Sequence, residues 1–330
     1  MRIENYTPFI GKHCETTTLG NLLQSCEIKL SEPMLFGLGE GLSFLYWDSK
    51  QMGFPFLGGR CKPDVLTENL VKNLNLSIEV SQTTSRTKAW ENVKAYLDQG
   101  TPVGLKLDCY HLEYFTQKIH FAGHYVTIYG YDENFAYLID TDQQGTKGKT
   151  SLLSLSAARS EKGPMSSNNR SFTITREKEV PNLKDVIITA IKYNTQDYLN
   201  PPIQNISFKG IRKTAKVMGG WFERPGVTPE LITQTGTLME KAGTGGALFR
   251  NMYRDFLMEC NQRYPELKLQ APYEKFCSIA ELWTKVSSLL CEAGIQSNEQ
   301  YLKDASQILL EIANQEEEAM KLLYQLVNIT

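Results

Sequence analysis

The sequence predicts an α+β protein in which a domain of mixed helices and strands precedes an all-α domain. Its 330 residues exceed what a single hydrophobic core usually organises, so two domains are expected. Helix and strand patterns alternate over the first half, whereas only helical patterns follow from about residue 183 onward. We therefore expect a domain with an antiparallel sheet over residues 1–170 and a helical domain over residues 171–330.

The first helix is expected to begin near Cys14, because apolar residues follow at positions i, i+3, i+4 and i+7 of one helix face. These residues are Leu19, Leu22, Leu23 and Cys26. Residues 34–47 are apolar but contain three glycines, which indicates two short buried segments around a tight turn. Further helices are expected to start at Pro63 and after Ser85, because proline suits a first helical turn and serine can cap one.

Runs rich in β-branched and aromatic residues predict strands at residues 77–83, 102–110, 124–132 and 135–142. A polar turn at residues 132–134 separates the last two, which is typical of a β-hairpin. Residues 141–150 are expected to form a polar loop that leads into a short helix.

The segment from about residue 159 to residue 182 is the best candidate for a linker, because it is polar and contains Gly, Pro, Ser and Asn. It could instead include a strand at residues 171–175. Beyond it, helices are expected at residues 183–199, 205–218, 228–242, 246–263, 272–292 and 298–327. The run of glutamates at residues 316–318 is most simply a solvated helix face.

Composition and charge exclude several classes of function. The chain has 35 Lys and Arg against 37 Asp and Glu, and neither half is strongly basic, so no nucleic-acid partner is expected. There is no apolar window long enough to cross a membrane and no signal-peptide pattern at the N-terminus. The 7 cysteines are odd in number and widely spread, which argues against a disulfide framework. A cytoplasmic protein without membrane attachment is therefore expected.

The motifs predict neither a metal site nor a tightly bound cofactor. No pair of cysteines has the spacing of a zinc ribbon or a thioredoxin motif. His120 and His124 are close in sequence, but the strand character at His124 argues against a shared metal ion. The glycines of residues 243–246 precede a helix but lack the Lys-Ser/Thr pair of a phosphate-binding P-loop.

Three residues of the first domain can form a nucleophilic catalytic site: Cys14, His124 and Asp140. His124 opens one strand of the expected hairpin and Asp140 ends the next, so the two fall close together on neighbouring strands. A carboxylate can then orient one imidazole nitrogen while the other faces a nucleophile. Cys14 lies where a helix is expected to start, and the unpaired N–H groups there favour a thiolate.

Simpler interpretations of these residues are open. A histidine at the start of a strand is more often a structural hydrogen-bonding residue, and Asp140 could cap a turn. His13 is a weaker candidate for the base, because adjacent residues at a helix start point apart.

Longer stretches around these residues resemble a known family. Residues 123–142 resemble the His/Asp block of papain-like cysteine enzymes, particularly the bacteriocin-leader peptidases, and residues 13–23 (HCETTTLGNLL) resemble their Cys helix. A closer resemblance is to the butirosin-biosynthesis protein H family. The segments that carry it are HCETTTLGNLL, SEPMLFGLGEGLSF, FLGGR, the GHYV block and GTGGALFRNMYRDFL, and together they cover most of the chain.

This resemblance implies a papain-like catalytic domain and an acyltransferase activity. The named family member moves an aminoacyl side chain from an acyl-carrier-protein thioester to an amine of an aminoglycoside. By resemblance, Cys14 attacks the thioester, His124 activates first the thiol and then the acceptor amine, and Asp140 orients His124. The implied partners are an acyl carrier protein, whose phosphopantetheine thioester is the donor, and a small-molecule amine acceptor.

One departure from the papain-like pattern leaves the oxyanion donor open. Papain-like peptidases place a glutamine about six residues before the cysteine, and Pro8 stands there in this chain. The backbone N–H of Cys14 is one expected contributor.

Glu40, Arg60 and His13 are the candidates for substrate binding. Glu40 stands between two glycines in an apolar stretch, and a buried carboxylate there needs a partner. It could contact the acceptor amine or support the Cys/His site, or it could be an exposed turn residue. Arg60 follows two glycines and could bind a carboxylate or a phosphate of the carrier arm, or be a surface arginine.

Two other functions remain alternatives to the acyltransferase. The first is a cysteine peptidase or amidase with the same triad, in which water or a peptide replaces the amine acceptor. The second is a non-catalytic binding protein that keeps the papain-like fold. Product analysis with an amine acceptor separates the first two, and thiol-reactive labelling separates both from the third.

Overall fold

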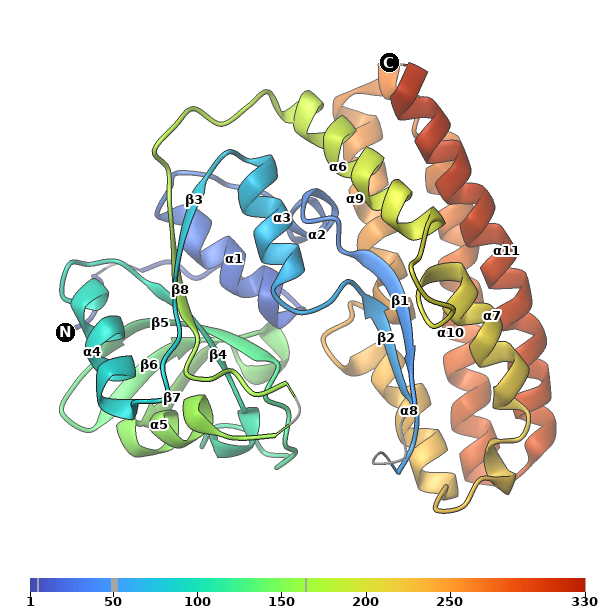
Figure 1. The fold of residues 1–330 in the computed structure, drawn as a ribbon, viewed down its shortest axis with the longest axis horizontal. Coiled ribbons are helices and arrows are strands. Elements are labelled where there is room, and N and C mark those ends of the chain that lie inside the picture. The colour runs from blue at the N-terminus through green and yellow to red at the C-terminus, as the bar shows by residue number, and fades with distance from the viewer. Residues whose placement is uncertain (5, 49–52, 164, 330) are drawn as a thin grey trace. The chain divides into compact units, whose positions relative to one another are not determined.

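The computed structural model describes residues 1–4, 6–48, 53–163 and 165–329, and it confirms the α+β class (Figure 1). The chain forms two compact units that interleave along the sequence. The sheet unit comprises Met1–Leu35 and Thr67–Pro181, and the helical unit comprises Phe36–Leu66 and Asn182–Thr330. Residues 36–66 therefore belong to the same unit as the C-terminal helices. The expected domains over residues 1–170 and 171–330 do not include this exchange of a segment.

The sheet unit is built on an antiparallel sheet. Its strands are β3 (Ser77–Ser81), β4 (Val103–Leu107), β5 (His124–Tyr131), β6 (Phe135–Ile139), β7 (Lys147–Ser151) and β8 (Ser171–Thr175). They lie in the order β3-β8-β4-β5-β6-β7, and neighbouring strands run antiparallel. The predicted hairpin is formed by β5 and β6, with Thr127 opposite Ile139 and a register shift between Ile128 and Gly130.

The helices of the sheet unit are α1 (Cys14–Gln24), α4 (Arg86–Leu97) and α5 (Leu152–Ser160), while α2 (Glu32–Leu38) and α3 (Val65–Asn73) each span a boundary between the two units. The predicted apolar face of α1 is buried throughout. Ser85 caps α4 as expected, since its hydroxyl accepts the N–H of Lys88 at 3.3 Å. Helices α4 and α5 share a hydrophobic core with β4, β5 and β6, and α1 packs against β4, β5 and β8.

One strand lies where the sequence predicted a loop. The strand β7 occupies the second half of the expected polar loop at residues 141–150 and pairs with β6 at the edge of the sheet. Its Gly148 and Thr150 are buried, whereas Lys147 and Lys149 are exposed. Lysines are common on edge strands, where they oppose pairing with other chains, and they make such a strand resemble a loop in composition.

The linker predicted around residues 159–182 is interrupted by a strand at residues 171–175. The strand β8 lies inside that segment and pairs with both β3 and β4. Its Ser171, Phe172, Thr173 and Ile174 are all buried. The alternative of a strand at residues 171–175 is therefore confirmed, and this strand lies inside the sheet between β3 and β4.

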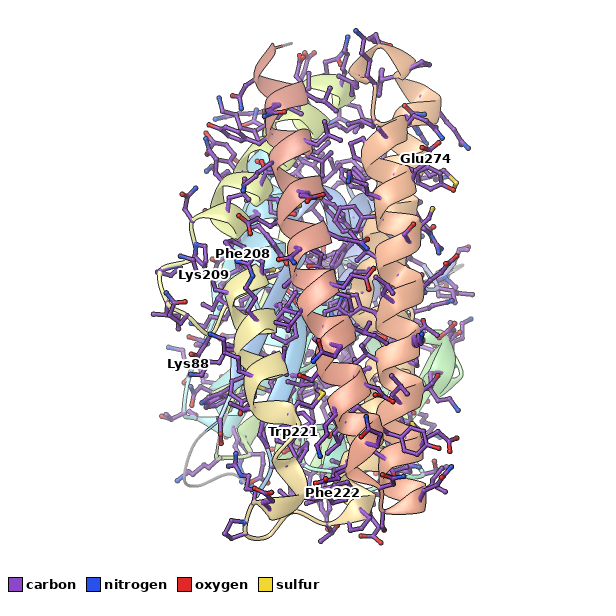
Figure 2. The ribbon with its side chains drawn as sticks, turned by 90° about the vertical axis from the view of Figure 1, so that its right-hand side faces the viewer. Lys88, Phe208, Lys209, Trp221, Phe222 and Glu274 are labelled. Carbon is purple, nitrogen blue, oxygen red and sulfur yellow. The ribbon has the colours of Figure 1, made fainter. Side chains whose placement is uncertain are left out.

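The helical unit contains α6 (Leu183–Leu199), α7 (Ser207–Met218), α8 (Pro229–Lys241), α9 (Arg250–Arg263), α10 (Gln270–Gln296), α11 (Glu299–Ile329) and the antiparallel hairpin of β1 (Leu42–Trp47) and β2 (Phe56–Arg60). Figure 2 shows α7, labelled at Phe208 and Lys209, on one side of the long helix α11 and α10 on the other side, and α11 packs against both. The hairpin packs against α7 through β1. Within the residues described, no helix combines the length and apolarity that a membrane crossing requires.

A buried ion pair connects α9 and α11. Arg250 donates from Nε and Nη2 to the two carboxylate oxygens of Glu316 at 2.8 and 2.9 Å, and both side chains are 0% exposed. Trp283 Nε1 donates to the same carboxylate at 2.7 Å, and the Tyr198 hydroxyl donates to it as well. The prediction of a solvated glutamate face is therefore wrong for Glu316, because this one residue of the run points into the core.

Gly59 is required by the approach of β2 to the start of α9. A Cβ at this position would lie 2.3 Å from the carbonyl oxygen of Leu248. Arg250 Nη1 donates to both backbone carbonyls, at 3.1 Å to Gly59 and 2.8 Å to Leu248. The glycine therefore serves the packing of the helical unit.

Candidate active site

Cys14 is the first residue of α1, and the residue before it forms hydrogen bonds with the first turn of that helix. His13 is the N-cap residue, in an extended conformation. Its carbonyl oxygen accepts the hydroxyl of Thr16 at 3.0 Å, and both the hydroxyl and the N–H of Thr17 at 2.7 and 2.9 Å. The Cys14 residue is half-buried, which leaves it in contact with solvent. A thiol in this position meets N–H groups that have no partner within the helix, and these favour an anion.

Glu32 holds this turn from α2, a role that the sequence did not reveal. Its carboxylate accepts the backbone N–H groups of Lys12 and His13 at 2.9 Å and the hydroxyl of Thr16 at 2.8 Å. Burial raises the pKa of Glu32, and these three donors oppose the rise. The sequence does show a glutamate at the start of the apolar SEPMLF segment. It does not show what Glu32 binds, because the groups that donate to Glu32 lie at residues 12–16, distant in sequence.

His124 and Asp140 form the contact that the hairpin predicts. His124 begins β5, Asp140 directly follows β6, and Nε2 of His124 lies 2.8 Å from Oδ2 of Asp140. The Asp140 side chain is 0% exposed and that of His124 is 9% exposed. Asp140 also accepts the Thr141 N–H at 2.7 Å and the Tyr114 hydroxyl at 2.8 Å. The carboxylate is thus held on both oxygens, and it orients the imidazole.

Cys14 lies close enough to His124 to raise the pKa of the imidazole. Because Nε2 of the imidazole faces Asp140, the nitrogen that remains for Cys14 is Nδ1. Burial lowers the pKa of His124, but the charge and hydrogen bond of Asp140, together with Cys14, raise it well above its ordinary value. A protonated imidazole beside a cysteine at a helix N-terminus is the environment in which a thiolate becomes a nucleophile.

Further side chains of the loop between β4 and β5 complete the surroundings of His124. The Phe115 ring meets the imidazole edge-on at a centroid distance of 5.3 Å. Cys109 is buried and its thiol donates to the carbonyl of Ile119 at 3.4 Å. Burial raises the pKa of the Cys109 thiol, and the nearby His124 lowers it. Neither Tyr114 nor Phe115 carries a sequence signal for this role, because the loop has no regular periodicity.

The other predicted site residues fall in two places. His13 belongs to the sheet unit and is only 4% exposed, and the structure shows it capping the helix that carries Cys14. Glu40 and Arg60 belong to the helical unit. Glu40 is 8% exposed with a left-handed φ of 55°, so it is not the exposed turn residue of the simpler interpretation. Arg60 ends β2, is half-buried and donates to the carbonyl of Cys61 at 3.2 Å. Substrate contacts of all three remain predictions.

The raised pKa of His124 predicts how its protonation depends on pH. In NMR titrations of imidazole signals, we expect His124 to stay protonated above the ordinary histidine pKa of about 6.5. Replacing Asp140 by Asn should lower the His124 pKa, because it removes the carboxylate that favours the imidazolium. The His124–Asp140 pair contributes to the free energy of unfolding fully at a pH below the pKa of His124 in the unfolded chain. This contribution is lost as the pH rises through the raised pKa of His124 in the folded protein. An unchanged His124 titration in Asp140→Asn would contradict this coupling.

Two family models match the chain. Residues 13–141 match the model described as butirosin biosynthesis protein H, N-terminal, and this range contains Cys14, His124 and Asp140. Residues 153–323 match a domain of unknown function (DUF4872). The second range begins within the sheet unit, so it includes β8 as well as most of the helical unit. A comparison with curated proteins gave no match.

Proposed function

Because residues 13–141 match the N-terminal model of butirosin biosynthesis protein H, with a DUF4872 domain following, we propose that the chain is a cysteine-dependent acyltransferase. In this proposal it moves an acyl or aminoacyl group from a carrier-protein thioester to an amine, in the biosynthesis of an aminoglycoside-like product. The sheet unit acts as a papain-like catalytic domain. The observation that supports the proposal is the pairing of His124 with Asp140 at 2.8 Å, with Cys14 near enough to raise the pKa of His124.

In the first half-reaction the Cys14 thiolate attacks the thioester carbonyl. The tetrahedral intermediate places a negative charge on oxygen, which the N–H groups at the start of α1, including that of Cys14, are positioned to stabilise. The C–S bond to the phosphopantetheine arm then breaks, and the His124 imidazolium gives its proton to the departing thiolate. This leaves an acyl-Cys14 thioester and a neutral His124 held by Asp140.

In the second half-reaction the amine attacks acyl-Cys14. Neutral His124 takes a proton from the attacking nitrogen, so an amide forms and Cys14 leaves as a thiolate. The thiolate–imidazolium pair is thereby restored. Asp140 keeps the imidazole oriented in both steps, and Tyr114 and the Thr141 N–H keep Asp140 in place.

Substrate selection in this proposal rests on Arg60, Glu40 and His13. The Arg60 guanidinium suits the phosphate of a phosphopantetheine arm, and the Glu40 carboxylate suits a cationic acceptor amine. His13 adjoins the nucleophile and supports the turn that carries it.

The experiment that tests the proposal follows the fate of the acyl group. The protein is incubated with an acylated carrier protein, with and without a set of aminoglycoside amines, and the products are identified by mass spectrometry. The proposal predicts an amide product and an acyl mass on the peptide that contains Cys14. Release of free acid alone, at the same rate with and without amines, would identify a hydrolase and overturn the transferase assignment.

A further inference from the structure

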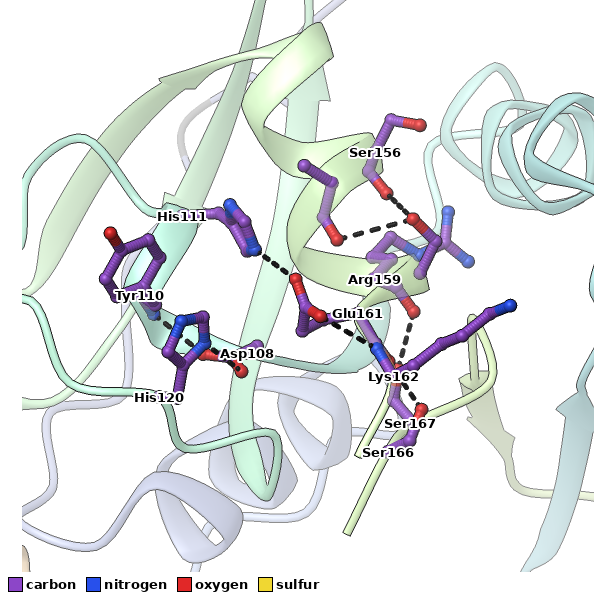
Figure 3. A network of polar contacts seen from close by, with 12 residues as sticks. Asp108, Tyr110, His111, His120, Ser156, Arg159, Glu161, Lys162, Ser166 and Ser167 are labelled. Atoms are coloured by element: carbon purple, nitrogen blue, oxygen red, sulfur yellow. Dashed lines mark hydrogen bonds and ion pairs between the residues drawn. The ribbon is translucent and has the colours of Figure 1, made fainter. Parts of the chain in front are cut away.

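A second cluster of titratable side chains lies on the loop between β4 and β5 and at the end of α5. His111 ends a short 3-10 helix on that loop, His120 lies further along it, and Glu161 is the C-cap residue of α5. Each offers one ligand atom, and the three atoms lie within 4.8 Å of one another. Figure 3 shows His111 and Glu161 facing one another, with His120 nearby on the same loop.

His120 is held in the way that metal-binding histidines are held. Its Nδ1 lies 3.1 Å from Oδ2 of Asp108, a carboxylate whose side chain is 3% exposed. The other oxygen of Asp108 accepts the N–H groups of Tyr110 and Phe121 at 2.9 and 3.1 Å, and the Tyr110 ring stacks on the imidazole at 3.9 Å. A buried carboxylate on one ring nitrogen orients the other nitrogen, Nε2, toward a metal ion and increases its basicity.

His111 and Glu161 already lie at nearly the separation of two ligands. Nε2 of His111 is 2.6 Å from Oε2 of Glu161. Two ligand atoms at about 2.0–2.1 Å from a tetrahedral zinc ion lie about 3.3 Å apart, so the pair has to open by less than about 1 Å.

We propose that His111, His120 and Glu161 form a binding site for a divalent transition-metal ion of the zinc type, with Asp108 as the outer-shell partner of His120. Their side chains are 24%, 60% and 31% exposed, so an ion can enter from solvent, and water can complete its coordination. Two imidazoles and one carboxylate suit zinc, whereas magnesium and calcium prefer oxygen ligands throughout.

The position of the site indicates a structural role beside the catalytic residues. An ion at this position joins the loop to the end of α5. The same loop carries Tyr114, which donates to Asp140, and Phe115, which contacts His124. Metal binding therefore orders the segment that supports the histidine–aspartate pair, without taking part in acyl transfer. This inference does not depend on the proposed function.

The test measures zinc binding to the full chain by calorimetry and by metal analysis after dialysis. It uses a Cys14→Ser background, so that the catalytic thiol cannot act as a ligand. The probe is zinc chloride alone, with magnesium chloride as the comparison. The variants are His120→Asn and Glu161→Gln, which remove ligands, and Asp108→Asn, which alters the outer shell. Glu133→Gln, an exposed carboxylate in the turn between β5 and β6, is the matched control.

We expect one zinc ion per chain in the background protein and in Glu133→Gln, with a rise in the unfolding temperature on zinc addition. His120→Asn and Glu161→Gln should weaken binding by about 100-fold or more, and Asp108→Asn by about 10- to 100-fold. Because His120 and Glu161 are partly exposed, these two variants should keep the far-ultraviolet circular dichroism spectrum of the parent. The absence of zinc binding in the background protein would overturn the proposal. So would a zinc affinity in both ligand variants equal to that of the background protein.

Discussion

Replacing Cys14 by serine is expected to reduce acyl transfer by a factor on the order of 10⁴ or more, which corresponds to about 5.5 kcal/mol of lost transition-state stabilisation. The hydroxyl is a far weaker nucleophile than the thiolate that His124 and the start of α1 support. Turnover of a carrier-protein thioester and the mass of the acylated protein are the two measurements.

The matched control for this variant is Cys26→Ala. Cys26 is also a free cysteine of the sheet unit, but its buried thiol donates to the carbonyl of Ile174 at 3.4 Å. We expect this variant to lose some stability and to keep its turnover. Wild-type turnover in Cys14→Ser would show that both the nucleophile and the covalent mechanism are assigned incorrectly.

The second large effect concerns the stability of the helical unit. We expect Arg250→Met to lower the free energy of unfolding by about 3–5 kcal/mol, because it leaves the Glu316 carboxylate buried without a cation. It also removes the donors to the carbonyls of Gly59 and Leu248. Chemical denaturation followed by circular dichroism measures the change.

Arg212→Met provides the comparison for this prediction. Arg212 on α7 pairs with Glu317 at 2.7 Å, and these side chains are 37% and 20% exposed. An ion pair in contact with solvent contributes about 1 kcal/mol or less. Equal losses in the two variants would mean that the burial of Arg250 and Glu316 does not determine the stability of this unit.

The sequence was sufficient to predict that His124 and Asp140 lie together and that a helix starts at Cys14, because short-range patterns place these residues. A hairpin with its turn at residues 132–134 brings the start of one strand and the end of the next together, so His124 and Asp140 meet. The start of α1 could be predicted at Cys14 because the apolar positions of that helix follow a regular period.

The features that escaped prediction depend on contacts between distant segments. The inward direction of Glu316 is determined by Arg250, Trp283 and Tyr198, which come from three other helices. The strand β8 contains serine and threonine that look like linker residues until β3 and β4 pair with them on both sides. Glu32 similarly acquires its role only when α2 packs beneath the turn at His13.

The central claim is that Cys14 is a nucleophile activated by His124, and alkylation kinetics test it most directly. Cys14, Cys61, Cys277 and Cys291 are all half-buried, so exposure alone does not distinguish them. With limiting iodoacetamide at neutral pH, followed by peptide mass spectrometry, we expect Cys14 to be labelled first and His124→Ala to slow its labelling about 10-fold or more. Labelling of Cys14 no faster than that of the other three, or an unchanged rate in His124→Ala, would contradict the account.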